Sequence, residues 1–147
     1  MKSIGEINLN KLIENKSFHP SPNQWEEQVL YILMVDRFSD GDEKHYKDNN
    51  GKTVNEGDTP AYNPEKDYEN DNNEKRNKAG LKWNGGTLNG LASKLGYLKR
   101  MGITTIWISP VLKQVAFEET YHGYATQNFL EIDPHFGTHK DLKEILC

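Results

Sequence analysis

Few side chains in this 147-residue sequence are placed to do chemistry on their own. Glu118 and Glu119 are adjacent, so their carboxylates can point in different directions, and they are poor candidates for a general acid and base pair. The pair Gly85-Gly86 fits neither the Gly-x-Gly-x-x-Gly dinucleotide pattern nor a phosphate-binding loop ending in Lys-Ser/Thr. There is no Gly-x-Ser-x-Gly elbow, which counts against a serine hydrolase. The motifs of this stretch therefore predict no catalytic residue.

Three short stretches remain as candidates. Asp36-Arg37 closes the first apolar run, where such a pair is more typical of a structural contact than of catalysis. Asp40-Gly41-Asp42 follows directly and is typical of a turn. Tyr121-His122-Gly123-Tyr124 is an aromatic-rich turn that follows the second apolar run, which closes at Ser109-Pro110.

Composition narrows the class of protein. Lys and Arg number 18 against 22 Asp and Glu, giving a net charge of −4, and no basic block points to nucleic acid. The one cysteine, Cys147, excludes an intrachain disulfide or a cysteine zinc cluster. No apolar run reaches the roughly 18 to 20 residues that span a membrane. Met1–Ser17 has no signal-peptide core, so we expect a soluble, cytoplasmic protein if Met1 is the true start.

The apolar pattern predicts two buried strands, each followed by a helix. Val29–Val35 is a continuous apolar run and Ile103–Ile108 is a β-branched run. Both favour strands covered on both faces, with Trp107 in the core. Leucines at spacings of three and four over Leu88–Met101 predict a helix between them. Thr138 with Asp141 resembles a capping box that opens a last helix, with Leu142, Ile145 and Leu146 on its buried side. This order is typical of a parallel sheet with crossover helices.

The regions outside this pattern are polar. Residues 1–28 form a polar lead-in, and residues 41–82 form a tract rich in Asn, Asp, Lys and Glu without a period. A loop of that length is expected to be functional, ion-bound or disordered. Two parallel strands alone do not make a stable sheet, so the pattern indicates the start of a larger repeating α/β fold.

Three blocks together resemble the N-terminal part of the catalytic domain of the α-amylase family, glycoside hydrolase family 13. They correspond to the first barrel strand with its turn, to the first helix with the second strand, and to a substrate-lining loop with the entry to the second helix. These blocks are Tyr31 to Asp42; Gly85 to Gly90, Leu95 to Leu98 and Met101 to Pro110; and Tyr121 to Tyr124, Asp133 to Thr138 and Asp141-Leu142. The resemblance runs from about Val29 to Leu146.

The resemblance implies an α/β fold, a partial TIM (β/α)₈ barrel made of its first two βα units, with a long polar insertion (41–82) after strand 1. Residues 29–147 would then be the N-terminal fragment of the catalytic barrel. The family cleaves or transfers α-glucosidic bonds, as in starch and maltooligosaccharides, with retention of configuration. Its two main carboxylates, roughly 5 to 5.5 Å apart, lie after later strands. We therefore expect this chain alone to be inactive.

The same resemblance implies the binding residues. Tyr124 matches the position whose ring stacks on the glucose at the cleavage subsite, the alternative being a buried core aromatic. His122 is expected to donate to a sugar hydroxyl or to orient the cleft wall, unless it is structural, and Tyr121 is expected to pack. The implied partners are an α-glucan or oligosaccharide substrate and the missing remainder of the barrel, with no nucleic acid and no membrane.

Calcium is the one cofactor that the resemblance suggests. Asp40 and Asp42 match a calcium-binding turn of some family members, and Asp48-Asn49-Asn50 could add to the six to eight oxygens that calcium prefers. The sequence departs from that pattern, with His45 and Tyr46 near the asparagine positions and Thr87 at a ligand aspartate. The alternative is a solvated acidic loop. For the function, the alternatives to an enzyme part are a non-catalytic carbohydrate- or partner-binding fragment and a truncated remnant without independent function.

Overall fold

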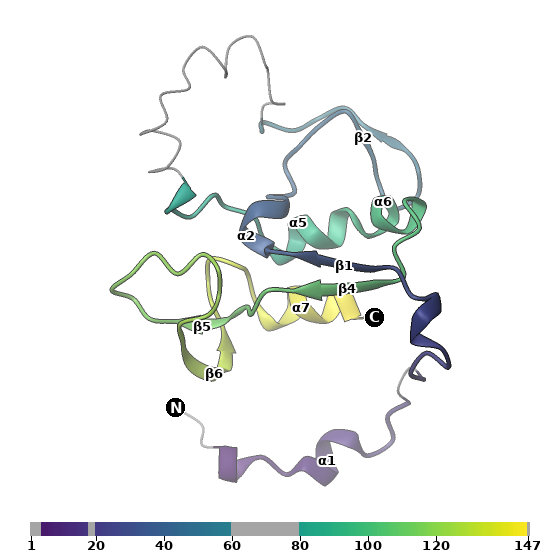
Figure 1. Ribbon diagram of the computed structural model, residues 1–147. Helices are drawn as coiled ribbons and strands as arrows, with labels where there is room; N and C mark the ends of the chain where they lie inside the picture. Colours follow the sequence, from purple (N-terminus) through teal and green to yellow (C-terminus); the bar gives the residue numbers. More distant parts are fainter. Residues whose placement is uncertain (1–3, 18–19, 60–79, 147) are drawn as a thin grey trace.

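The computed structural model describes residues 4–17, 20–59 and 80–146 (Figure 1). At its centre two strands pair in parallel, β1 (Leu30–Leu33) and β4 (Thr105–Ile108). Two helices lie between them in the sequence, α5 (Leu88–Ser93) and α6 (Leu95–Arg100), and α7 (His139–Leu146) comes last. The predicted order of strand, helix, strand and helix, with parallel pairing, is therefore confirmed.

The helices cover one face of the β1–β4 pair. Side chains alternate between the two faces of a strand, and Tyr31 and Leu33, opposite Ile106 and Ile108, point toward the helices. They pack with the apolar residues of all three helices in one cluster. Its buried members are Leu33, Val35, Leu88, Leu91, Leu98, Val111, Ile132 and Phe136.

The other face of the β1–β4 pair is open. Ile32 and Trp107 are opposite each other in the register and are 65% and 58% exposed, and Leu30 is exposed beside them. The expectation of cover on both faces, with Trp107 in the core, is therefore wrong for the part of the chain that the structure describes. The physical reason is that every helix packed on this sheet lies on its opposite face.

The predicted single helix over Leu88–Met101 is two short helices. The chain breaks at Lys94, which ends α5 and begins α6, and Met101 is 55% exposed. The Thr138–Asp141 capping box is confirmed, because an Asp141 oxygen accepts hydrogen bonds from the Thr138 N–H and Oγ1, both at 2.7 Å. Leu142 and Ile145 pack on the core, whereas Leu146 is 68% exposed and not buried as expected.

Two hairpins were not predicted. One is β2 (Tyr46–Lys47) with β3 (Thr53–Val54), inside the polar tract; the other is β5 (Leu112–Gln114) with β6 (Thr126–Ile132), after β4. Both are antiparallel. Residues 60–79 of the predicted insertion, and Cys147, lie outside the described residues, so the insertion as a whole stays a prediction.

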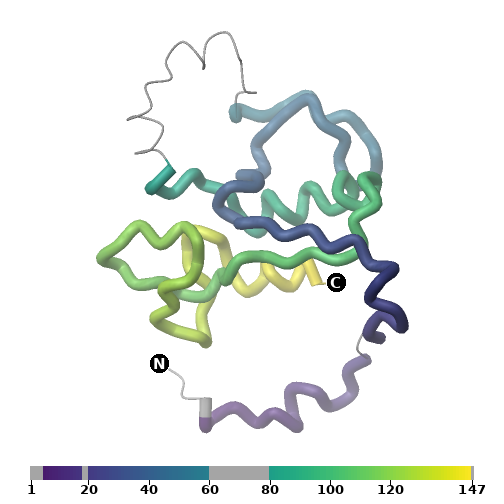
Figure 2. The backbone as a smooth tube through the Cα atoms, viewed as in Figure 1, coloured from purple at the N-terminus to yellow at the C-terminus, as the bar shows by residue number. Residues whose placement is uncertain are grey.

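The predicted lead-in contains short helical turns. These are η1 (Ile4–Glu6), α1 (Leu9–Ile13) and η2 (Trp25–Glu27), and after β1 the single turn α2 (Val35–Phe38) follows. Figure 2 shows the segment that holds α1 running as an arm outside the sheet and helices. Among the described residues, none of the helices has the length and apolar character needed to cross a membrane. The boundary at residue 28 and the cytoplasmic location stay predictions.

Candidate functional site

Asp36 follows the carboxyl end of β1, and its carboxylate is paired with backbone N–H groups and with Arg37. Its carboxylate accepts hydrogen bonds from the N–H of Asn84, at 3.0 Å to each oxygen, and from that of Gly85 at 3.1 Å. Its side chain is 1% exposed, and the Arg37 Nε lies 3.4 Å away. The structure therefore supports the prediction that this pair is structural, because the carboxylate joins the end of β1 to the loop that enters α5.

Arg37 ties the same strand end to the aromatic turn. Its Nη2 donates to the Gly80 carbonyl at 2.8 Å, and its guanidinium lies 4.0 Å from the centroid of the Tyr121 ring. A guanidinium at that distance from a ring is attracted to the negative face of the ring. Tyr121 therefore packs against Arg37, as the sequence predicted.

Gly123 allows the chain to reverse between β5 and β6. Its φ is +83°, and an added Cβ would lie 1.8 Å from the Pro110 carbonyl oxygen, so only glycine fits this close approach. The turn therefore lies against the residue that closes β4. This contact carries His122 and Tyr124 on the side of the sheet where the parallel strands end.

His122 and Tyr124 lie side by side in this turn. The Tyr124 N–H donates to His122 Nδ1 at 2.9 Å, and the two rings stack with centroids 5.9 Å apart and 20° between their planes. Because Nδ1 accepts, the proton of the neutral ring is on Nε2, which remains a donor. Tyr124 is 71% exposed, so its ring is not a core aromatic.

Sequence reasoning missed Gln114, which is 1% exposed. Its side chain accepts from the Ala125 N–H at 2.9 Å and donates to the Gly123 carbonyl at 3.0 Å. It therefore contacts both neighbours of Tyr124. The one signal in the sequence is an uncharged amide among the apolar residues after Pro110, which alone does not distinguish a buried polar group from a surface one.

Asp133 anchors the end of β6 and is 2% exposed. Burial raises the pKa of its carboxyl. The hydrogen bonds from the N–H groups of Gln114 and His135 and from the His135 ring, helped by the charge of Lys113, outweigh burial and hold the pKa below the usual range. The carboxylate is therefore the form that the fold stabilises.

We expect this carboxylate to make stability depend on pH. A folded-state pKa below the unfolded value of about 3.9 contributes stability above that value, and the contribution is lost as the pH falls through the folded-state pKa. At pH 6 the midpoint of thermal unfolding should be higher for the wild-type protein than for an Asp133→Asn variant. This difference should shrink below about pH 4. Glu131→Gln, at an exposed position on the same strand, is the control. A difference that is constant from pH 6 to pH 3 would contradict the assignment.

A cavity of about 380 Å³ lies beside this hairpin, and Trp83, Lys113 and Thr120 are among its lining residues. Glu118 and Glu119 line it as well, whereas Tyr124 and His122 do not. The candidate site therefore rests on the exposed turn and not on this cavity.

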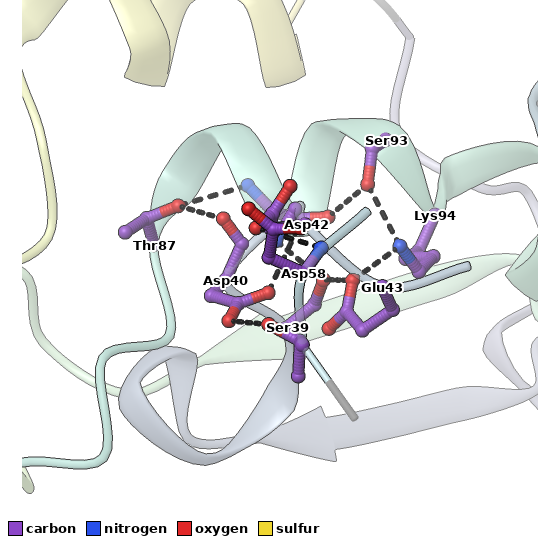
Figure 3. A network of polar contacts seen from close by, with 11 residues as sticks. Ser39, Asp40, Asp42, Glu43, Asp58, Thr87, Ser93 and Lys94 are labelled. Atoms are coloured by element: carbon purple, nitrogen blue, oxygen red, sulfur yellow. Dashed lines mark hydrogen bonds and ion pairs between the residues drawn. The ribbon is translucent and has the colours of Figure 1, made fainter. Parts of the chain in front are cut away.

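The acidic turn after α2 is held by protein donors (Figure 3). Asp40 accepts a hydrogen bond from the Asp42 N–H at 2.8 Å and another from the Thr59 hydroxyl, and Asp42 accepts from the Asp58 N–H at 3.1 Å. The hydrogen bond from Thr59 is the largest cause that lowers the pKa of Asp40, and the charge of Lys94 adds to it. The turn therefore keeps two carboxylates next to each other by pairing their oxygens with N–H and O–H groups.

The calcium prediction concerns the same turn, with Asp40 and Asp42 as ligands. Among residues 4–17, 20–59 and 80–146, no group of three or more His, Cys, Asp or Glu converges as a metal centre. The Asn49 amide instead bonds the Gly96 N–H and the Ala92 carbonyl at the junction of α5 and α6. Calcium at Asp40 and Asp42 therefore stays a prediction.

Lys94 contacts Glu43, the residue that follows this turn. Lys94 is 9% exposed, and its ammonium lies 2.8 Å from a Glu43 carboxylate oxygen (Figure 3). The same ammonium lies 3.5 Å from the centroid of the Tyr46 ring. Burial raises the pKa of Glu43, but the hydrogen bonds from Lys94 and Ser39 keep it below its usual value. This ion pair fixes the acidic turn against the helix junction.

Comparison with known proteins identifies the class of protein. Residues 32–147 match the family model of the alpha-amylase catalytic domain. The chain therefore belongs to the alpha-amylase family.

Curated relatives agree with this assignment. The chain is 38% identical over 122 residues to the beta/alpha-amylase of Paenibacillus polymyxa, which covers 83% of this chain and 8% of that protein. It is 38% identical over 124 residues to the cyclomaltodextrin glucanotransferase of Klebsiella oxytoca, covering 81% and 16%. The chain thus spans a small part of the length of the relatives it matches.

Solved structures show the same fold. The alpha-amylase of Geobacillus thermoleovorans, complexed with acarbose, matches with a TM-score of 0.51 and 32% identity, over 83% of this chain and 20% of that chain. The Anoxybacillus alpha-amylase matches with a TM-score of 0.55 and 31% identity, over 84% and 21%. The α/β fold is confirmed, and the small shares covered agree with a partial barrel.

Proposed function

We propose that this chain is the N-terminal part of the catalytic barrel of a retaining glycoside hydrolase or transglycosylase that acts on α-glucosidic bonds. The observation that carries the proposal is the exposed Tyr124 ring, placed beside His122 on a turn that packs against the end of β4. In (β/α)₈ barrels the active site lies at the carboxyl ends of the strands. The family assignment supports the substrate class, an α-glucan such as starch or a maltooligosaccharide.

The two side chains suit complementary parts of a sugar. A glucose ring has an apolar C–H face, and the Tyr124 ring can desolvate that face with few rotatable bonds to order. His122 Nε2–H, free of the bond that occupies Nδ1, can donate to a hydroxyl at the rim of the same ring. Both groups bind and orient, and neither breaks a bond.

The bond-breaking groups are proposed to come from the rest of the barrel. Retaining hydrolysis needs two carboxylates, one as nucleophile and one as acid/base. Asp36, the buried carboxylate at the end of β1, is saturated by backbone N–H groups and Arg37, so it is unsuited to either role. The resemblance implies that both carboxylates follow later strands, and we expect these 147 residues alone to show no turnover.

The open face of the β1–β4 pair supports this view. Leu30, Ile32 and Trp107 are apolar and exposed on it, an arrangement that costs free energy in water. In a closed barrel this face would be the interior, packed by the side chains of the other strands. The proposed partner of this face is therefore the remainder of the same barrel.

Substitution of Tyr124 tests the proposal in the intact protein, by which we mean this chain together with the proposed remainder of the barrel. With a maltooligosaccharide substrate, Tyr124→Ala should lower kcat/KM about 30-fold, which corresponds to about 2 kcal/mol of lost binding to the sugar face. Tyr124→Phe keeps the ring and should retain most activity. Tyr97→Ala removes a partly exposed tyrosine from α6 and should change nothing.

Two outcomes would reject the proposal. An intact protein that neither cleaves nor transfers α-glucosidic bonds is not the predicted enzyme, and saturable maltooligosaccharide binding without turnover would instead favour a carbohydrate-binding fragment. Unchanged kcat/KM in Tyr124→Ala would remove the assigned role of this ring.

A further inference from the structure

We propose that Gln114 is a positioning residue for Tyr124, one that fixes the direction of the exposed ring before sugar binds. The inference rests on the proposed function, because it concerns the same turn. Gln114 does not contact the substrate. Its side-chain amide holds the backbone of the aromatic turn in place, and that backbone positions the Tyr124 ring.

The amide group of Gln114 is surrounded by backbone partners. Its Nε2 donates to the Leu112 carbonyl at 2.6 Å and to the Gly123 carbonyl at 3.0 Å, and its Oε1 accepts from the Ala125 N–H at 2.9 Å. A primary amide has two N–H donors, so both are used. Tyr124 therefore lies between two residues that are bonded to the same side chain.

Gln114 is itself held on its strand. Its own N–H donates to an Asp133 carboxylate oxygen at 2.9 Å, and the other Asp133 oxygen accepts from the His135 N–H at 3.0 Å and contacts the His135 ring at 2.7 Å. The His135 ring in turn stacks on Trp83 at 4.0 Å. The buried Asp133 carboxylate thus holds the backbone of Gln114, and the side-chain amide of Gln114 in turn holds the aromatic turn.

Tyr124 has little else to hold it. Its side chain is 71% exposed, and its one described ring neighbour is His122, which belongs to the same turn. The backbone of the turn therefore sets the point from which the ring projects, and the ring of His122 from the same turn lies beside it. A platform ordered in advance loses less entropy on binding than one that must be ordered by the sugar.

The free-energy cost of burying a polar side chain also supports a positioning role for Gln114. A buried amide without partners destabilises a protein, whereas an apolar residue of equal size in this strand would not. Here every polar atom of the side chain is paired, and two of the three bonds go to the turn. The pairing couples β5 to the tip of its own hairpin.

Gln114→Met tests the inference in the intact protein, because methionine has similar length and no amide. Hydrogen exchange of a peptide covering residues 120–125 should become faster, while that of β1 and β4 stays unchanged. With a maltooligosaccharide, kcat/KM should fall about tenfold, through KM more than kcat, because a displaced platform weakens binding whereas a smaller folded fraction lowers kcat alone. Gln127→Met makes the same substitution at an exposed position on the paired strand β6, so it is the matched control and should alter neither readout.

A double-mutant cycle separates positioning from general stability. If Gln114 acts through Tyr124, Gln114→Met should lower kcat/KM less than about twofold further in the Tyr124→Ala background. Full additivity, or unchanged exchange at 120–125, overturns the inference. Should Gln114→Met not fold, Gln114→Glu retains the shape but sets a carboxylate against two carbonyl oxygens, and the same exchange and cycle criteria apply. Exchange needs no substrate, so it decides the positioning claim even if the wild-type protein has no activity on α-glucans.

Discussion

Replacement of Asp36 by alanine is expected to lower the stability of the intact protein by about 3 kcal/mol. The N–H groups of Asn84 and Gly85 would lose their acceptor in a part-buried place, and Arg37 would lose its ion-pair partner. A buried donor left without an acceptor costs about 1 to 3 kcal/mol, so the loss at two donors exceeds that of an ordinary hydrogen bond. The measurement is the midpoint of thermal or urea unfolding.

Asp36→Asn distinguishes this structural role from a catalytic one. Asparagine keeps one acceptor oxygen, so the loss of stability should be smaller, and turnover at a temperature where the variant is folded should persist. Glu26→Ala, which removes an exposed carboxylate, should leave the unfolding midpoint unchanged. If Asp36→Asn abolished turnover with its stability intact, the carboxylate would be part of the catalytic machinery and the assignment would be wrong.

Local signals in the sequence predicted the elements that are determined locally. The apolar runs at β1 and β4 predicted two strands, which the structure confirms, although it covers them on one face only. The leucine spacing predicted the apolar side of the helical segment, which the structure divides into α5 and α6. The pairing of Thr138 with Asp141 depends on a spacing of three residues, and it too is confirmed. The order of these elements predicted a parallel α/β sheet, and the resemblance to the family extended that prediction to a partial (β/α)₈ barrel.

The features that were missed depend on contacts between distant residues. Trp107 is as apolar as a core residue, but its exposure follows from which face the helices cover. Gln114 reads as an ordinary polar residue, because its partners Gly123 and Ala125 are brought to it by a hairpin that the sequence did not predict. Asn49 was one of the residues that could add an oxygen to a calcium site, whereas the structure pairs its amide with the backbone of α5 and α6.

A second large effect is expected at Gly90, where helix propensity and packing predict opposite signs. Gly90 lies inside α5, and alanine in a helix interior is favoured over glycine by about 1 kcal/mol. A Cβ at this position, however, would lie 1.9 Å from the Ser39 carbonyl oxygen and 2.9 Å from the Gly41 nitrogen. These are backbone atoms of the acidic turn, so the clash is not relieved by moving a flexible side chain.

Packing should therefore decide the sign of the change in stability. Gly90→Ala should destabilise the intact protein by about 2 kcal/mol or more, because overpacking in a close contact typically costs about 1 to 3 kcal/mol and shifts the backbone. The reverse substitution in the same helix, Ala92→Gly, is the control, and it should cost about 1 kcal/mol through propensity alone. The unfolding midpoints of the two variants, compared with wild type, make the test. A Gly90→Ala variant more stable than wild type would contradict the close approach of α5 to the Ser39 carbonyl oxygen, and with it the packing of the acidic turn on α5.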